Sequence, residues 1–414
     1  MPDALTSTVR MPENGPPPQT FWSRVRARVF RPWMVKFCAS YIVLVCLIAV
    51  FVPFLATGKP YTCIVPAHHG VPMQRKYPLF RDLTSVSWVL LVVTGALAVQ
   101  GSCVFFTRRL MPDMRRRRRR VWLAVVTVAA VIASGLIVAL HHNRLDATNY
   151  RSLAAHEKIT HAIFAPIPWG YAAMEPLSKN LINKLPSQQH WLGTDGEGRD
   201  VLSRLLWSTR VAMGIGFISQ FIALAIGVVV GSMTGYFSGI VDILLMRLVE
   251  IVESVPLFFL ILTFVAIYGR HIFYIMVILG VTGWTGYARL LRGEFLHLRQ
   301  LDYVTAAQAS GLPLWRVLFR HILPNGVTPV LVSASFGLAG AVTIESSLSY
   351  LGVGVRPPTP SWGQMLNAAG NPATVFHWWQ ALGPGMMLFI TVLAFNIVGE
   401  SFRDTLDPRN AGAG

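Results

Sequence analysis

Charged residues are scarce in this chain of 414 residues. Only 13% of them are Asp, Glu, Lys or Arg, whereas soluble domains carry about 25%. Hydrophobic residues make up 53%, and the mean hydropathy is +0.50. A composition so poor in charge argues against an ordinary soluble domain and predicts a protein with several membrane spans.

Acidic residues are scarcer than basic ones: 19 Asp and Glu stand against 36 Lys and Arg, and the formal net charge is +17. In a membrane protein this excess follows from topology, because Lys and Arg collect in the segments that stay inside the cell. It therefore does not indicate nucleic acid as a partner. The run Arg115–Arg120 is typical of a topology anchor, so the partner expected there is membrane lipid with anionic head groups.

Cysteine is rare, and no two cysteines form a CxxC pair. The four are Cys38, Cys46, Cys63 and Cys103. This pattern predicts neither a disulfide framework nor a thiol-based metal site.

Two sequence motifs of enzymes are also missing. No GxxxxGK[ST] phosphate loop exists, since Gly58-Lys59 is followed by Pro60, so we expect no ATP hydrolysis by this chain alone. His156 and His161 are five residues apart, whereas a zinc-protease helix needs its histidines four apart on one face. The sequence thus predicts no catalytic residue and no metal site. A membrane-embedded metalloenzyme using this region stays as an alternative of a different class.

The apolar segments predict an all-α polytopic membrane protein with about eight spans. Five basic residues between Arg24 and Lys36 precede the first span, which places the N-terminus inside, and an even number of spans returns the C-terminus to the same cytoplasmic side. The predicted spans are 37–56, 83–106, 121–140, 211–236, 248–268, 272–291, 327–346 and 383–398. A secondary transporter is a further alternative, but it predicts inverted repeats and charges at mid-span, and the sequence has neither.

The same pattern divides the chain into five parts. Residues 1–36 are a cytoplasmic tail, 37–141 hold the first span and an extra two-span hairpin, and 142–208 form a periplasmic segment. Residues 209–404 form the transmembrane core, and 405–414 a second cytoplasmic tail. An amphipathic helix from Asp200 is expected to lie along the outer surface before the fourth span, with Asp200 and Arg204 paired.

Some residues inside or beside the spans carry expectations of their own. Pro256 predicts a kink in the fifth span. Glu250 and Glu253 are expected at the inner interface rather than against a solute, and Glu345 is expected to face either a pathway or the outer loop. Glycines at four-residue steps predict a smooth ridge for close helix packing: Gly227, Gly231, Gly235 and Gly239.

The polar segment 294–325 lies between two spans and predicts two short helices with a break. The first helix covers 303–310, and Gly311 stops it in a left-handed turn. Pro313 opens the second helix from its first position, and Pro324 ends it. Basic residues in and before the segment place it in the cytoplasm.

This segment resembles the coupling loop of the permease subunits of ABC importers. The residues that carry the resemblance are Thr305-Ala306-Ala307, Gly311 and Ile322-Leu323-Pro324, with Thr305 where the family usually has Glu. The resemblance implies docking to an ATPase subunit, and Asp302, one turn earlier, could supply the missing charge. The residues implied in this coupling are Asp302, Tyr303, Thr305, Ala306, Ala307, Gly311, Arg316, Arg320 and Pro324.

Three further stretches resemble the dipeptide/oligopeptide (peptide/nickel) group of these permeases, and its C-type subunit in particular. They are HWLGTDGEGRDVLSRL, PPTPSWG and the ending TVLAFNIVGESFRDTLDPR. The hairpin of spans two and three has no place in that pattern. The outer surface implied for a solute-binding protein consists of Gly193, Thr194, Asp195, Gly198, Arg199, Asp200, Pro357, Pro358, Pro360 and Trp362.

The resemblance implies the transmembrane domain of a type I ABC importer. The chain would be a non-catalytic permease subunit without a cofactor of its own, moving di- or oligopeptides across the bacterial inner (plasma) membrane. The implied partners are a second permease subunit in a heterodimer, two ATPase subunits that bind ATP and Mg, and a periplasmic or lipoprotein solute-binding protein. The same class of transporter with nickel, a peptide antibiotic or another solute is the alternative.

Overall fold

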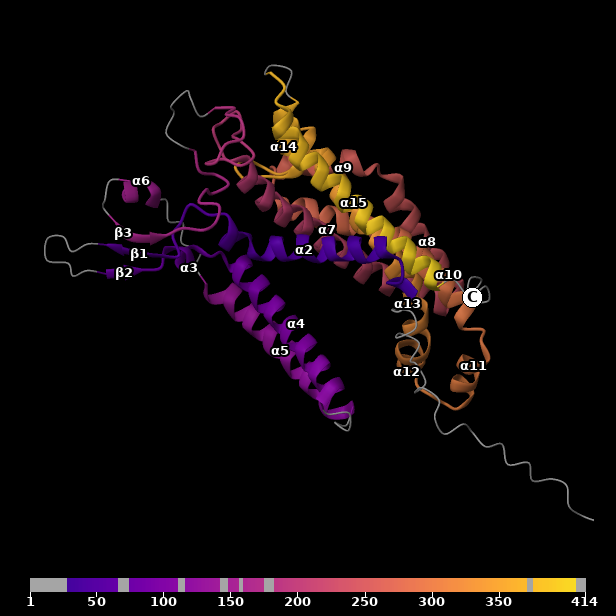
Figure 1. The fold of residues 1–414 in the computed structure, drawn as a ribbon. Helices are drawn as coiled ribbons and strands as arrows, with labels where there is room; N and C mark the ends of the chain where they lie inside the picture. The colour runs from indigo at the N-terminus through magenta and orange to yellow at the C-terminus, as the bar shows by residue number, and fades with distance from the viewer. Residues whose placement is uncertain are drawn as a thin grey trace, which may run out of the picture.

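The computed structural model describes residues 28–65, 74–110, 116–141, 148–155, 159–174, 182–370 and 375–406. Within these residues, seven helices are long and apolar enough to cross a membrane, or eight if the bent pair α8–α9 counts as one span. The predicted membrane protein with about eight spans is thereby confirmed. Figure 1 shows the long helices running in one bundle, with a two-helix hairpin splayed away from it.

The long helices begin and end close to the predicted spans. Their bounds are α2 Trp33–Leu55, α4 Ser85–Leu110, α5 Arg116–Leu140, α7 Val201–Phe237, α8 Gly239–Ser254, α9 Leu257–Tyr268, α10 Ile272–Leu298, α13 Leu323–Tyr350 and α15 Trp378–Leu406. The short elements are α3 Pro78–Asp82, α6 Tyr150–Ala155, α11 Asp302–Ala309, α12 Leu314–Arg316, a π-helical turn Val317–Ile322, α14 Trp362–Ala369, and the strands β1 Thr62–Val65, β2 Gln74–Lys76 and β3 Thr160–Ile163.

A glycine ridge lets α7 pack directly against α10. A Cβ on Gly227, Gly231 or Gly235 would come within 3.0 Å of atoms of α10, so only glycine permits this separation. The predicted ridge is therefore confirmed for three of its four members. Gly239 differs, because it begins α8 and a Cβ there would meet nothing within 4 Å.

The fifth predicted span is two helices rather than one. Helix α8 ends at Ser254, α9 begins at Leu257, and the two are bent by 71°. The kink expected at Pro256 is confirmed, because proline has no N–H to bond to the preceding turn. The predicted start at 248 was wrong, since α8 already begins at Gly239.

A small three-stranded antiparallel sheet, with strand order β2-β1-β3, adds to the predicted helical fold an element that was not expected from the sequence. The strands have three or four residues, too few to show a clear alternation of apolar and polar side chains. Strands β1 and β2 precede the hairpin α4–α5 in the chain and β3 follows it, so the hairpin is inserted between strands of one sheet. We call the end of the molecule that carries this sheet the sheet end (Figure 1), and the opposite end the α11 end.

Two further predictions about helix boundaries were wrong. The helix from Asp200 is not a separate surface helix, because α7 runs unbroken from Val201 into the apolar span and no helix-breaking residue lies between them. Pro324 does not end a helix either. It lies in the first turn of α13, directly after a π-helical turn in which the Leu323 N–H bonds to the Leu318 carbonyl five residues back. Pro313 is the N-cap of α12 rather than its first residue.

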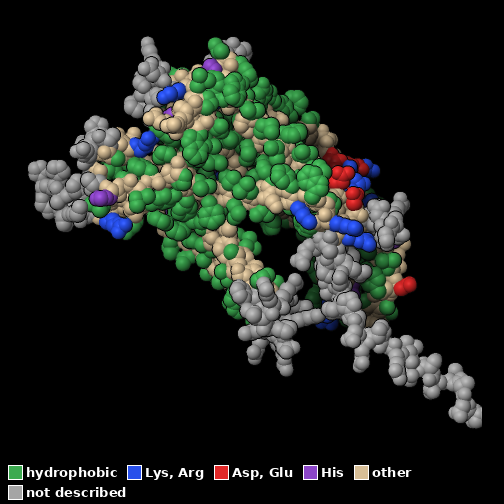
Figure 2. All heavy atoms as spheres, viewed as in Figure 1, with side chains coloured by type: hydrophobic (Ala, Val, Ile, Leu, Met, Phe, Trp, Pro, Cys, Tyr) green, Lys and Arg blue, Asp and Glu red, His purple; other side chains and the backbone are tan. Residues whose placement is uncertain are grey.

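The hairpin α4–α5 stands apart from the bundle. Its two helices pack on each other, and its contact with the bundle is mainly between α4 and α2. Its two ends meet, since His141 Nε2 lies 2.8 Å from the Leu83 carbonyl. Apolar side chains cover the middle of the face drawn in Figure 2, and most of the Lys, Arg, Asp and Glu side chains drawn there lie toward the ends. This distribution is what a bilayer requires.

Candidate functional site

The α11 end carries a compact pair of short helices. Val304 and Ala307 of α11 are buried in the same core as Val317, Ile322 and the end of α10 at Phe295. The chain turns between α11 and α12 at Gly311, whose φ is +70°, as predicted. The helix α11 therefore shares one buried core with α10 and with the start of the helix that continues into α13.

Large apolar side chains remain exposed on this helix pair. Tyr303 is 40% exposed, Trp315 59% and Phe319 66%. They belong to a polar segment beyond the apolar part of α10, where lipid does not explain their exposure. Exposed aromatic side chains of this kind are enriched in protein–protein interfaces.

The nine residues predicted for coupling divide by exposure. Ala307 is buried in the shared core, and Arg316 is half-buried with its guanidinium carbon 5.3 Å from the centre of the Trp315 ring. The other seven are exposed on the helix pair: Asp302, Tyr303, Thr305, Ala306, Gly311, Arg320 and Pro324. Ala307 thus contributes to the core, and the surface for a partner comes from its neighbours.

Polar contacts fix the helix pair to the end of α7. Gln308 Nε2 donates to the Tyr236 hydroxyl over 3.3 Å, and Arg299 Nη1 donates to the Tyr236 carbonyl over 3.0 Å. Next to them, Arg292 of α10 forms a two-pronged ion pair with Asp242 of α8, at 2.5 and 2.6 Å. Bidentate pairs of this geometry hold their helices in a defined register.

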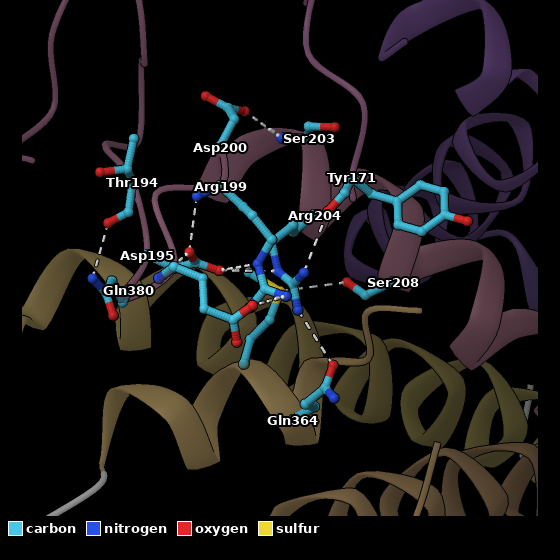
Figure 3. Close-up of polar contacts among 12 residues, drawn as sticks. Tyr171, Thr194, Asp195, Arg199, Asp200, Ser203, Arg204, Ser208, Gln364 and Gln380 are labelled. Atoms are coloured by element: carbon cyan, nitrogen blue, oxygen red, sulfur yellow. Dashed lines mark hydrogen bonds and ion pairs between the residues drawn. The ribbon is translucent and has the colours of Figure 1, made fainter. Parts of the chain in front are cut away.

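The sheet end is held together by buried charges (Figure 3). Arg199 Nε donates to Asp195 Oδ2 over 2.8 Å, and Arg204 Nε lies 3.4 Å from the same oxygen. Arg204 also donates to the Tyr171 carbonyl and to Gln364 Oε1 of α14, each over 3.3 Å. One buried guanidinium therefore joins α7, α14 and the segment before the loop 190–200.

Asp200 has two tasks in this loop. Its Oδ1 accepts from the Ser203 N–H over 2.7 Å and so caps α7, and its Oδ2 lies 2.8 Å from His190 Nδ1. Burial raises the pKa of the Asp200 carboxyl, although the Ser203 N–H and His190 act against this rise. The ion pair predicted between Asp200 and Arg204 was wrong. Arg204 pairs with Asp195 instead, and the Asp200 carboxylate bonds to His190.

The residues predicted as an outer docking surface are mostly inside. Only Pro357 and Pro358 are exposed. The eight others are buried: Gly193, Thr194, Asp195, Gly198, Arg199, Asp200, Pro360 and Trp362. The stretch LGTDGEGRD folds into tight turns in which Asp195 accepts from the Glu197 and Arg199 N–H groups, so its side chains satisfy its own backbone.

A cavity of about 440 Å³ lies in the bundle, walled by α7, the α8–α9 break, α10 and α13. Gln220 of α7 and Tyr287 of α10 line it and bond to each other over 2.5 Å, and Gln220 Nε2 donates to the Gly337 carbonyl of α13 over 3.0 Å. These residues stand near the middle of their helices, so the cavity is at mid-bundle depth. Cavities of this size hold small molecules.

The acidic residues singled out from the sequence have different fates. Glu250 is on the surface, paired with Arg247 at 2.6 Å. Glu253 is exposed, lines the cavity and pairs with Arg289 at 2.5 Å, and its expected place at the inner interface stays a prediction. Glu345 is fully buried and accepts from Ser349 Oγ over 2.7 Å, next to the loop that leads to α14.

Sequence reasoning missed the residues that join distant parts of the chain. Arg204, Gln364 and Gln380 meet at the sheet end, and Gln220 meets Tyr287 in the cavity wall. The available signal was a polar side chain inside an apolar helix, as at Gln220. Among the described residues no three His, Cys, Asp or Glu side chains gather as for a metal ion, while His156 lies outside the described residues.

Comparison with known proteins finds one matching protein family and several relatives. Residues 227–412 match the family described as "binding-protein-dependent transport system inner membrane component". The glutathione transport system permease protein GsiD of Pectobacterium atrosepticum is 37% identical over 248 residues, 60% of this chain and 82% of that protein. The oligopeptide permease protein OppC of Bacillus subtilis is 37% identical over 250 residues, 60% of this chain and 81% of that protein.

The dipeptide permease protein DppC of Bacillus subtilis is 34% identical over 227 residues, 55% of this chain and 71% of that protein. A solved structure of the methionine ABC transporter MetNI aligns with 49% of this chain and 97% of its own, at 20% identity and a TM-score of 0.41. The relatives named as peptide and glutathione permeases are thus similar over most of their own length.

Proposed function

Because the chain belongs to the family of binding-protein-dependent inner membrane transport components, in its peptide-type permease branch, we propose that it is the permease subunit through which an ATP-driven importer moves di- or oligopeptides. The relatives named for oligopeptide, dipeptide and glutathione transport support this substrate class. Nickel, or a peptide antibiotic, is the alternative solute within the same class of transporter.

The observation that carries this proposal is the helix pair α11–α12. It shares a buried core with α10 and with the helix that continues into α13, yet it exposes Tyr303, Trp315 and Phe319. A partner bound to this surface can therefore move α10 and α13, which form two walls of the cavity, at the same time. ATP binding in the partner would push the pair and open the cavity outward, and hydrolysis would reset it.

The proposal includes the partners of this chain. A second permease subunit completes the pathway, two ATPase subunits bind ATP and Mg, and an extracytoplasmic binding protein, periplasmic or lipoprotein, delivers the solute. The chain itself is then non-catalytic and carries no cofactor. It lies in the bacterial inner membrane with both termini and the α11 end in the cytoplasm, where its basic residues are most favourable.

Docking of the ATPase subunit is assigned to the exposed members of the predicted set. Thr305 replaces the usual Glu, and Asp302, at the start of α11 and exposed like Thr305, supplies the negative charge. At the sheet end, Pro357 and Pro358 are the exposed candidates for contact with the binding protein. The buried charges behind them hold the loops in place.

Purification of the tagged chain in mild detergent tests the proposal. We expect ATPase subunits and a second permease of similar length to copurify. Trp315→Ala is expected to reduce the ATPase subunits recovered roughly tenfold, as losing an aromatic interface anchor does. Trp378→Ala is the matched control, because Trp378 is 58% exposed against 59% for Trp315 but lies at the sheet end.

A chain that purifies with unrelated proteins, and that does not rebind purified ATPase subunit when it is added, would contradict the proposal. Rebinding without copurification would instead indicate a weak complex. Thr305→Glu is then expected to restore copurification, because it returns the charge that the resemblance implies.

A further inference from the structure

Among the described residues that line the mid-bundle cavity, Glu253 carries the one charged side chain. The other lining residues are apolar, small or neutral, including Gly283, Gly337, Gly340 and Ala341. A Cβ on Gly340 would meet nothing within 4 Å, so this part of the wall is open. Small residues leave room for variable groups and offer no pocket that selects one side chain.

The neutral polar groups of the wall are already engaged. Gln220 bonds to Tyr287 and to the Gly337 carbonyl, and Thr282 Oγ1 donates to the Ile278 carbonyl over 2.8 Å. The Glu253 carboxylate is therefore the group in the wall with the strongest capacity to attract a ligand. A carboxylate favours a cation and repels an anion, and this one is already paired with a cation, Arg289.

Arg289 keeps this carboxylate paired without belonging to the cavity wall. Its Nη2 lies 2.5 Å from Glu253 Oε2, and its side chain is 50% exposed, so the guanidinium can move into water. A ligand ammonium that takes its place exchanges one ion pair for another and leaves the half-exposed Glu253 carboxylate paired. A ligand carboxylate has no such exchange available next to Glu253.

From this geometry we infer that Glu253 is a specificity-determining residue that receives the protonated amino terminus of the transported peptide. The inference rests on the proposed function and names the feature that the cavity recognises. An α-ammonium is common to all unmodified peptides, whereas their side chains vary. A wall with one fixed negative charge and otherwise small residues fits that combination.

Charge-selective labelling in the assembled complex tests the inference without requiring transport. The reporter is Thr282→Cys, in the cavity wall, on a chain whose four native cysteines are replaced by serine. Its rates of reaction with a cationic and an anionic methanethiosulfonate of similar size are compared. We expect the cation-to-anion rate ratio to fall roughly tenfold with Glu253→Gln.

The matched control is Glu250→Gln, one turn away on α8 in an exposed ion pair. It is expected to leave the ratio unchanged. Tri-alanine is further expected to protect the cysteine only when Glu253 is present, and N-acetyl-tri-alanine is expected not to protect it. A ratio equal in the Glu253→Gln and unmodified complexes, or equal protection by both peptides, would overturn the inference.

A failure of the proposed function gives a different result. It would appear as absence of ATP-dependent tri-alanine uptake by the unmodified complex, whatever the labelling ratio. Unmodified complex that takes up tri-alanine but shows no charge preference at Thr282→Cys would keep the function and discard the role of Glu253.

Discussion

Two pairs of apolar helices, α7–α10 and α4–α5, differ in how they are packed. In the apolar stretches of α4 and α5, no residue is buried within this chain. In the apolar stretch of α7, 33% of the residues are buried, and in that of α10, 56% are. Mean hydropathy does not separate them, since α5 scores 2.7 and α10 only 1.2. Hydropathy therefore predicts whether a helix crosses the membrane, and the four-residue spacing of glycines on α7 distinguishes the packed pair.

A glutamine in each pair sharpens this difference. Gln220 accepts from the Tyr287 hydroxyl and donates to the Gly337 carbonyl, so it joins three helices around the cavity. Gln100 joins only α4 to α5, donating to Thr127 Oγ1 over 2.9 Å. The same residue type therefore joins three helices beside the mid-bundle cavity in one pair and only two helices in the other.

The largest difference between the pairs is expected from adding bulk to a glycine. Gly231→Leu would bring its Cβ 2.7 Å from the Ala288 carbonyl and 2.9 Å from Leu291 Cβ, so α7 and α10 must separate. We expect the free energy of unfolding to fall by about 3 kcal/mol and little complex to assemble. Gly101→Leu in α4 meets nothing within 4 Å and should assemble normally. Equal yields after size-exclusion chromatography would contradict the packing described.

The next effect concerns the link between the core pair and the helix pair α11–α12. Gly311→Leu forces a left-handed backbone on a bulky residue, at a cost of about 1–2 kcal/mol, without touching another group. We expect peptide uptake to fall about tenfold while ATP hydrolysis and membrane insertion persist. Gly311→Asn, which tolerates this backbone, and Gly135→Leu in α5 are expected to transport normally. Unchanged uptake in Gly311→Leu would count against coupling through this turn.

A smaller effect is expected from removing each glutamine. Gln220→Leu leaves the Tyr287 hydroxyl and the Gly337 carbonyl without their partner, at a cost of about 1–3 kcal/mol. Gln100→Leu removes the bond to Thr127 Oγ1 and a long one of 3.5 Å to the Leu123 carbonyl, and should cost about 0.6 kcal/mol. Thermal denaturation of the detergent-solubilised complex measures both. If Gln100→Leu lowered the denaturation temperature as much as Gln220→Leu or more, the two helix pairs would not differ in packing as described.

The smallest effect on assembly and uptake is expected from removing the hairpin itself. Its ends lie within hydrogen-bonding distance at Leu83 and His141, so residues 85–140 can be replaced by a short Gly-Ser linker, which leaves an even number of spans. The core loses the bond between Arg210 Nη1 and Ser87 Oγ, of 3.0 Å, which is worth about 1–2 kcal/mol. Copurification with the ATPase subunits and uptake should persist. Loss of the partners would show that the hairpin is part of the assembly.

Local patterns in the sequence predicted much of the fold and the turn at Gly311. Spans follow from apolar runs, the ridge on α7 from glycines four apart, and the bend from Pro256, because each depends on residues close in the chain. The bonds of Arg204 to Gln364 and of Gln220 to Tyr287 join residues 160 and 67 positions apart, and nothing local specifies such a pair. The loop 190–200 was expected on the surface for the same reason, since its polar side chains find their partners only in the folded chain.

Uptake by the reconstituted complex tests the central claim most directly. The purified chain, its copurifying partners and the solute-binding protein are placed in proteoliposomes, and accumulation of labelled tri-alanine is followed with and without ATP. The account predicts accumulation that requires ATP, that falls about tenfold in Gly311→Leu and that continues in Gly311→Asn. ATP hydrolysis with no accumulation of tri-alanine by the unmodified complex would contradict it.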